Sequence, residues 1–298
     1  MPHTTRRNPP SSQQHKRLQI TDSSGWTHIT TTKTARRLHR SNKARDTNKV
    51  NSENLRPDDQ EANQEHATIE PLVPAEAPAA VTLPDLQKKL TEYQLRWEGS
   101  ETWNGARGAL QRAFKYSDDD NNDKDKEAAG VSIVCVGLGS PSGFLRGGWV
   151  DRRTVSMYQL AALASVKGWI DLTWQTYPPE KKLPPHTLKA YAQDPVFNNH
   201  DKSLLNSLGI SVLEHPGAFA QVSSRTILFC PGAERRHLEL LLARDPAVVL
   251  GGPLEDMDSD VVKGFIRGRD SVRLARFEEQ EHAFWGMGVY YAPPKETG

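Results

Sequence analysis

The stretch VSIVCVGLGS, residues 131–140, decides the fold class. Its first six residues are almost entirely apolar, as expected of a strand that helices cover on both faces. Gly137 and Gly139 follow at once, where the chain has to turn. Residues 155–166 then repeat apolar side chains at helical spacing. A buried strand, a tight glycine turn and a helix are typical of an α/β domain.

The same alternation continues downstream of this unit. Four more short apolar runs follow, with helical segments between them: residues 186–195, 210–215, 225–232 and 247–253. One intervening helix is expected to begin at Asp201, as N-cap, and to end at Gly209. Two later runs, SVRLARF and FWGMGVYYAP, are expected to add edge strands. We therefore predict a three-layer, Rossmann-like, mostly parallel sheet of about five to seven strands.

Two helices are expected to precede this sheet, so the folded domain is predicted to span residues 85–298. In the first helix, Leu86, Leu90, Tyr93 and Trp97 form one apolar stripe. The second helix is predicted over residues 101–116. The acidic run at residues 117–127 breaks the periodicity and favours an exposed loop.

The N-terminal region differs sharply in charge from the rest of the 298-residue chain. Residues 1–56 hold 12 Lys and Arg against three acidic residues, a net charge of +9, whereas the remainder carries −8. With few apolar residues, this basic tail is expected to be disordered, and residues 57–84 to form an acidic, Pro/Ala-rich linker. Residues 36–45, RRLHRSNKAR, are interpreted either as a solvated tail or as a nuclear-import or nucleic-acid contact.

Composition excludes several classes of protein. The mean hydropathy is −0.66, and no run of 18 apolar residues offers a membrane-spanning helix. The N-terminus lacks the apolar core of a secretory signal. Cys135 and Cys230 each lie inside an apolar run, which indicates buried thiols rather than a disulfide or zinc framework. A cytoplasmic or nuclear protein without a metal site or membrane partner is therefore expected.

Candidate site residues follow the ends of the predicted strands, because ligands of open α/β sheets bind beyond the carboxyl ends of the strands. The predicted cofactor-binding residues are Gly137, Gly139, Ser140, Asp194, Pro231, Glu234 and Gly251. Glycines admit an anion or a ribose close to the backbone, and Asp194 offers acceptors to ribose hydroxyls. This pattern is similar to a pocket for S-adenosylmethionine or a nucleotide. A tight turn without any ligand explains the same glycines.

The pocket pattern departs from known fingerprints. Pro141 interrupts GxGxxG, and Asp194 lies 55 residues after Gly139 rather than about 20. Cys135 stands where methyltransferases often have an acidic residue. Motifs for serine hydrolases, P-loops and zinc proteases are absent from the sequence, so catalytic residues stay unassigned.

A set of short motifs, in order and spacing, resembles a known family. They are Gly25-Trp26-Thr27, VCVGLGS, Tyr158-Gln159-Leu160-Ala161, Asp194-Pro195-Val196-Phe197, Asp201, Leu205, Leu208-Gly209, Thr226-Ile227-Leu228-Phe229, Leu241-Leu242 and Ala283-Phe284. The chain is similar to the family named for sensitivity to red light reduced, and specifically to its fungal members. That resemblance implies light signalling, circadian regulation or control of haem biosynthesis, with no firmly assigned reaction.

The resemblance also has gaps. Where many members have Pro-His-Cys, this chain has Pro231-Gly232-Ala233, and where they have Gly-Asn-Ser it has Gly251-Gly252-Pro253. Any role of that His and Asn is lost here, because glycine and proline side chains neither donate nor accept hydrogen bonds. Two hypotheses follow. One is a regulatory protein that binds a small molecule or an unidentified protein partner. The alternative is a group transferase using S-adenosylmethionine or a nucleotide.

Overall fold

A computed structural model describes residues 17–21, 27–31, 74, 76–117, 131–143, 152–175 and 188–293. It divides the chain into two units, residues 1–71 and 72–298, which we describe separately.

The first unit contains an antiparallel hairpin. Strand β1 (Arg17–Thr21) pairs with β2 (Thr27–Thr31), with Leu18 opposite Thr30 and Ile20 opposite His28. These two strands lie inside the tail that the sequence predicts to be disordered. The tail therefore contains a local hairpin that the sequence analysis did not predict. The rest of residues 1–56, with residues 57–73 of the predicted linker, lies outside the described residues.

The second unit is built on a seven-stranded sheet of order β5-β4-β3-β6-β7-β9-β8. Its strands are β3 (Ser132–Val136), β4 (Lys189–Gln193), β5 (Ile210–Val212), β6 (Thr226–Cys230), β7 (Val248–Gly251), β8 (Asp270–Arg273) and β9 (Gly288–Tyr291). The first five in spatial order are parallel, and β9 is antiparallel to both β7 and β8. The prediction of a mostly parallel α/β sheet is confirmed.

One strand lies in a place that the sequence analysis did not predict. FWGMGVYYAP was expected to supply an edge strand, yet β9 lies between β7 and β8. All four of its residues are buried, as an interior strand requires, whereas β8 is largely exposed and forms the edge. When the seven strands of this sheet are numbered 1 to 7 by their order in the sequence, the spatial order is 3-2-1-4-5-7-6. The order reverses between β3 and β6, which is the topological switch point.

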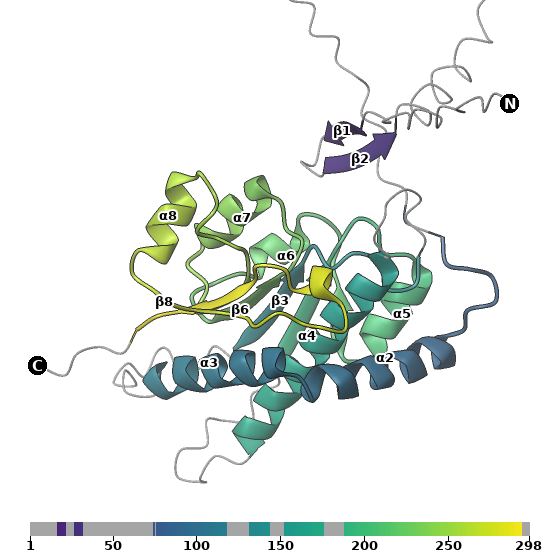
Figure 1. Ribbon diagram of the computed structural model, residues 1–298, viewed down its shortest axis with the longest axis horizontal. Helices are drawn as coiled ribbons and strands as arrows, with labels where there is room; N and C mark the ends of the chain where they lie inside the picture. The colour runs from purple at the N-terminus through teal and green to yellow at the C-terminus, as the bar shows by residue number, and fades with distance from the viewer. Residues whose placement is uncertain are drawn as a thin grey trace, which may run out of the picture. The chain divides into compact units, whose positions relative to one another are not determined.

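Helices cover both faces of the sheet. Figure 1 shows α2 and α3 crossing one face while α7 and α8 lie on the opposite one. The described helices are α2 (Leu83–Glu98), α3 (Glu101–Ser117), α4 (Arg152–Gln175), α5 (Asn199–Ser207), α6 (Gly217–Ala220), α7 (Arg235–Leu242), α8 (Asp260–Ile266) and the 3-10 turn η3 (Glu281–Ala283). The two predicted N-terminal helices are thus present, and α4 is longer than the predicted 155–166.

The N-terminal helices are joined to the sheet through aromatic packing. The α2 helix starts with a capping box in which Thr82 and Asp85 exchange hydrogen bonds. At its other end Trp97 is 1% exposed and packs on Trp103, Phe277 and Phe284 with ring centroids 4.3 to 6.0 Å apart. This cluster ties α2 and α3 to the segment that precedes β9.

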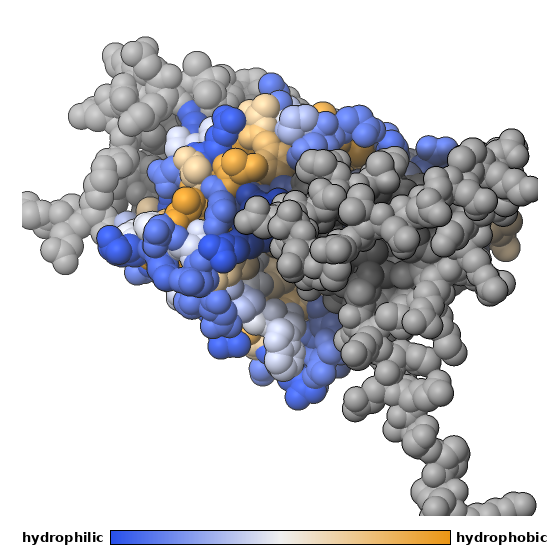
Figure 2. Space-filling view, turned by 90° about the horizontal axis from the view of Figure 1, so that it is seen from above, coloured by the Kyte–Doolittle hydropathy of each residue, from blue (hydrophilic) through white to orange (hydrophobic). Residues whose placement is uncertain are grey.

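Figure 2 shows hydrophobic residues in a small group among hydrophilic ones on the part of the surface that is coloured. Two exposed large apolar side chains, Leu240 and Val261, belong to α7 and α8. Scattered apolar residues of this kind are normal on folded proteins. None of the described helices combines the length and apolar character needed to cross a bilayer.

Candidate functional site

The loops predicted to carry the site meet at one edge of the sheet. Strands β4, β3, β6 and β7 are successive parallel neighbours, so their carboxyl ends lie side by side. We call this edge, formed by residues 137–143, 194–198 and 231–234, the rim. Six of the seven predicted residues lie within it; Gly251 ends β7 next to it. The rim includes the switch point between β3 and β6, where ligands of doubly wound folds bind.

The loops after β3 and β6 touch through their backbones. A Cβ atom on Gly137, whose φ is +79°, would lie 2.6 Å from the amide nitrogen of Ala233. A Cβ atom on Gly232 would lie 2.6 Å from the carbonyl oxygen of Gly137. Packing between the loops therefore accounts for these glycines. Pro231 and Glu234 flank the contact, with Glu234 as the N-cap residue of α7.

Asp194 joins the loops after β3 and β4. Its Oδ2 accepts a hydrogen bond of 2.8 Å from the Gly139 N–H, and its Oδ1 accepts one of 3.1 Å from the Val196 N–H. Burial outweighs these two bonds and raises the pKa of Asp194 from 3.8 to about 6. The residue as a whole is nevertheless partly exposed. A carboxylate offers about four acceptor positions, so Asp194 keeps room for further donors.

A second carboxylate, Asp201, holds the loop after β3 more tightly. It is fully buried and accepts hydrogen bonds from the hydroxyls of Ser140, at 2.5 Å, and of Ser142, at 2.7 Å. The backbone N–H groups of Ser142 and Asn198 donate to it as well, at 3.0 and 3.1 Å. Burial raises the pKa of Asp201, although the serine hydrogen bonds oppose the shift. Asp201 thus anchors the loop.

The prediction that Asp201 is the N-cap of its helix is wrong. Asn198 is the N-cap of α5, and Asp201 is the third helical residue of a capping box. The sequence signal was present, because an Asn followed three residues later by a carboxylate is the spacing of such a box. The contact with Ser140 and Ser142 had no local signal, since about 60 residues separate the partners.

Two histidines from different parts of the sequence come together beside the rim. His215 and His237 have ring centroids 6.1 Å apart, and Phe219 lies 5.4 and 5.5 Å from them. Gln193, the last residue of β4, is hydrogen-bonded to His215 at 3.0 Å and accepts from the Ala218 N–H. Among the described residues, no three His, Cys, Asp or Glu side chains are grouped to hold a metal ion.

Comparison with protein-family models decides the family. The SRR1 domain, for sensitivity to red light reduced, matches residues 86–291, which is more than half of the chain. The chain belongs to the SRR1 domain family. Its SRR1 domain runs from within α2 to the last residue of β9 and so contains the whole rim. The resemblance seen in the sequence is confirmed at the level of the family, and the fungal subgroup stays a prediction.

Neither curated proteins nor solved structures yield a match to this SRR1 domain protein. The structure explains one position at which this sequence differs from the pattern of many family members. At Gly232, where the resemblance implies histidine, any side chain would collide with the carbonyl of Gly137. In this SRR1 domain the loop after β6 is therefore fitted to glycine, and a histidine there would require the two loops to move apart.

Proposed function

We propose that this SRR1 domain protein is a regulatory binding protein rather than an enzyme, and that its rim binds a small adenosine-containing molecule. The family resemblance links such proteins to light and circadian signalling and to haem biosynthesis. A cytoplasmic or nuclear protein with that role needs a ligand or partner site more than a reaction.

The single observation that carries the proposal is that the two carboxylates of the rim region accept hydrogen bonds from the loop after β3. Asp194 and Asp201 together receive hydrogen bonds from backbone N–H groups and serine hydroxyls of the loop after β3. A general base needs a nucleophile within reach and access to substrate. Ser140 and Ser142, the hydroxyls that Asp201 contacts, are buried at 2 and 3% exposure. These contacts favour a rigid, preorganised binding edge over catalysis.

The choice of an adenosine-containing ligand rests on Asp194. Its place directly after β4, beside the switch point, suits a carboxylate that accepts hydrogen bonds from two ribose hydroxyls. Its partial exposure and unused acceptor positions leave room for them. S-adenosylmethionine and nucleotides share that ribose, so the proposal covers both.

A second candidate function, an S-adenosylmethionine-dependent group transferase, is favoured by the sheet. Its strand order reverses between β3 and β6, and doubly wound sheets bind nucleotide-type cofactors at such a reversal. Fold alone does not fix function, because the same fold supports many activities. Cys135 at the position where methyltransferases often have an acidic residue, 0% exposed, argues for the binding role.

Product analysis separates the two functions. The full chain is incubated with S-adenosylmethionine, or with ATP, in the presence of a cell extract that supplies acceptors, and the cofactor is then quantified. The binding role predicts that the cofactor is recovered unchanged, in the same amount as with an Asp194→Asn control. Release of S-adenosylhomocysteine or of nucleotide products above that control establishes the transferase instead.

The proposal also includes a partner. A regulatory protein acts through an unidentified protein partner or through its ligand, and the basic tail of residues 1–56 offers a site for either nuclear import or nucleic acid. Loss of nuclear accumulation on replacing Arg36, Arg37 and Arg40 by Gln would support import, whereas an unchanged distribution would remove it.

A further inference from the structure

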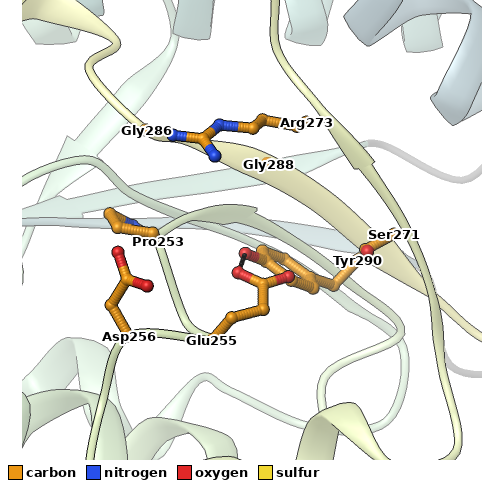
Figure 3. Close-up of a pocket in the computed structure, with 8 residues that line it drawn as sticks. All are labelled: Pro253, Glu255, Asp256, Ser271, Arg273, Gly286, Gly288 and Tyr290. Atoms are coloured by element: carbon orange, nitrogen blue, oxygen red, sulfur yellow. Dashed lines mark hydrogen bonds between the residues drawn. The ribbon is translucent and has the colours of Figure 1, made fainter.

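A cavity of about 170 Å³ lies beyond the β7 end of the rim, between the loop after β7 and strands β8 and β9 (Figure 3). None of the cofactor-binding residues predicted from the sequence lines it. The lining residues are Pro253, Glu255, Asp256, Ser271, Arg273, Gly286, Gly288 and Tyr290. They come from the loop after β7, from the edge strand β8 and from the segment that forms β9.

The register of the two antiparallel strands creates the cavity. Arg273 pairs with Gly288, and Ser271 pairs with Tyr290. Side chains two residues apart on a strand point to the same face, so these four positions share one face of the sheet. Gly288 has no side chain and leaves that face open. A Cβ atom there would lie 3.2 Å from the Tyr290 ring, so the opening depends on glycine.

The two sides of the cavity carry opposite charges. Figure 3 shows the Arg273 guanidinium on one side and the carboxylates of Glu255 and Asp256 on the other. Within the part of the chain that the structure describes, neither Arg273 nor Asp256 forms an ion pair. Glu255, Asp256 and Arg273 are all exposed, so opposite charges face each other across a space that is open to solvent.

Glu255 is held in place by a buried tyrosine. The Tyr290 hydroxyl donates to Glu255 Oε2 at 2.7 Å and accepts a hydrogen bond of 3.1 Å from the Leu254 N–H. Burial raises the pKa of Tyr290, so the hydroxyl keeps its proton and remains a donor to the carboxylate. One acidic wall of the cavity is therefore preorganised rather than mobile.

We propose that this cavity binds a free α-amino acid, with the ligand carboxylate on Arg273 and its ammonium group between Glu255 and Asp256. Arginine recognises carboxylates through paired hydrogen bonds, and an ammonium group is attracted by two carboxylates. At about 170 Å³ the cavity is smaller than the pockets that hold cofactors, and its size suits an amino acid. Its three charged side chains sum to −1, which favours a basic amino acid.

Calorimetric titration of the full chain tests the proposal with L-lysine, L-alanine, L-glutamate, acetate and methylamine. Lysine should bind most tightly, alanine less tightly and glutamate weakest of the three. Acetate and methylamine, which each carry one charge, should not bind. Equal binding of acetate or methylamine and alanine, or no binding of any amino acid at about 10 mM, overturns the proposal.

Matched variants locate the site. Arg273→Gln should weaken alanine and lysine binding about tenfold or more, the effect of losing a charge-assisted pair. Arg267→Gln removes an exposed charge at the end of α8 and should change neither. Asp256→Asn should reduce the preference for lysine over alanine. Equal effects of the two arginine variants would overturn the proposal. Asp194→Asn should leave this binding intact, which separates the cavity from the ligand proposed at the rim.

Discussion

The carboxylate of Asp194 accepts a 2.8 Å hydrogen bond from the backbone N–H of Gly139, although 55 residues separate the two. This one contact fastens the turn after β3 to the end of β4, beside the point where the strand order reverses. The loop after β3 is thereby held in place by the carboxylate that follows β4.

The raised pKa of Asp194 gives the contact a pH dependence. The folded pKa of about 6 exceeds the ordinary value of 3.8, so the folded state binds more protons between these values. The stabilising contribution is full below pH 4 and is lost as pH rises through 6, by up to about 3 kcal/mol. Urea unfolding of the wild type and Asp194→Asn should therefore show the wild type's advantage shrinking from pH 4.5 to 7. A constant difference would contradict the assignment.

Gly137 should be intolerant of a side chain. Its φ of +79° and the 2.6 Å approach of Ala233 and Gly232 predict that Gly137→Ala lowers the free energy of unfolding by about 3 kcal/mol or more. Gly105, inside α3, has nothing within 4 Å of the place that a Cβ atom would take, so Gly105→Ala should be stabilising by about 1 kcal/mol. Denaturant unfolding measures both, and equal effects would show that the loops after β3 and β6 are not in contact.

Asp201 should be a major anchor of the domain. Asp201→Ala removes the carboxylate that accepts hydrogen bonds from Ser140, Ser142 and Asn198, and leaves these donors without an acceptor. It should lower the free energy of unfolding by about 3 kcal/mol or more. Asp171→Asn loses only an i,i+4 pair with Lys167, worth about 0.5 kcal/mol or less. Chemical denaturation of the two variants compares them directly. A mild Asp201→Ala effect would mean that water replaces the carboxylate.

Removal of residues 1–56 should leave the melting temperature almost unchanged. The folded SRR1 domain begins well after this tail, and the tail has few apolar residues to bury. Differential scanning calorimetry of the full and shortened chains measures the difference. A fall of several degrees would show instead that Trp26 docks on the domain.

Local sequence patterns predicted the elements of the fold well, for a physical reason. Strands β3, β6 and β7 are buried on both faces, so they appear as apolar runs, and helix α2 carries its apolar residues as one stripe. The place of β9 was not predictable in this way. Whether a buried strand is inserted or added at an edge depends on pairing across the sheet, which leaves no local pattern.

The site was predicted only where topology alone decides it. Gly137, Asp194 and Pro231 share an edge because parallel strands end together. The contacts of these residues were not predictable, since Gly137 and Gly232 pack the two loops together and Asp194 accepts a hydrogen bond from Gly139. Their role in binding a cofactor stays a prediction. The cavity at Arg273 was missed because its walls come from β8, β9 and a loop, and its charges lie in separate parts of the sequence.

Thermal-shift measurement of the full chain tests the central claim, that the rim binds an adenosine-containing ligand, most directly. S-adenosylmethionine, S-adenosylhomocysteine, ATP, NAD and haem are each added to the wild type, to Asp194→Asn and to the control Asp171→Asn. A ligand at 100 times its Kd stabilises by about 2.7 kcal/mol. We predict that at least one adenosine ligand raises the Tm of the wild type and of Asp171→Asn but not of Asp194→Asn. No shift with any adenosine ligand, or a shift that persists in Asp194→Asn, would contradict the account.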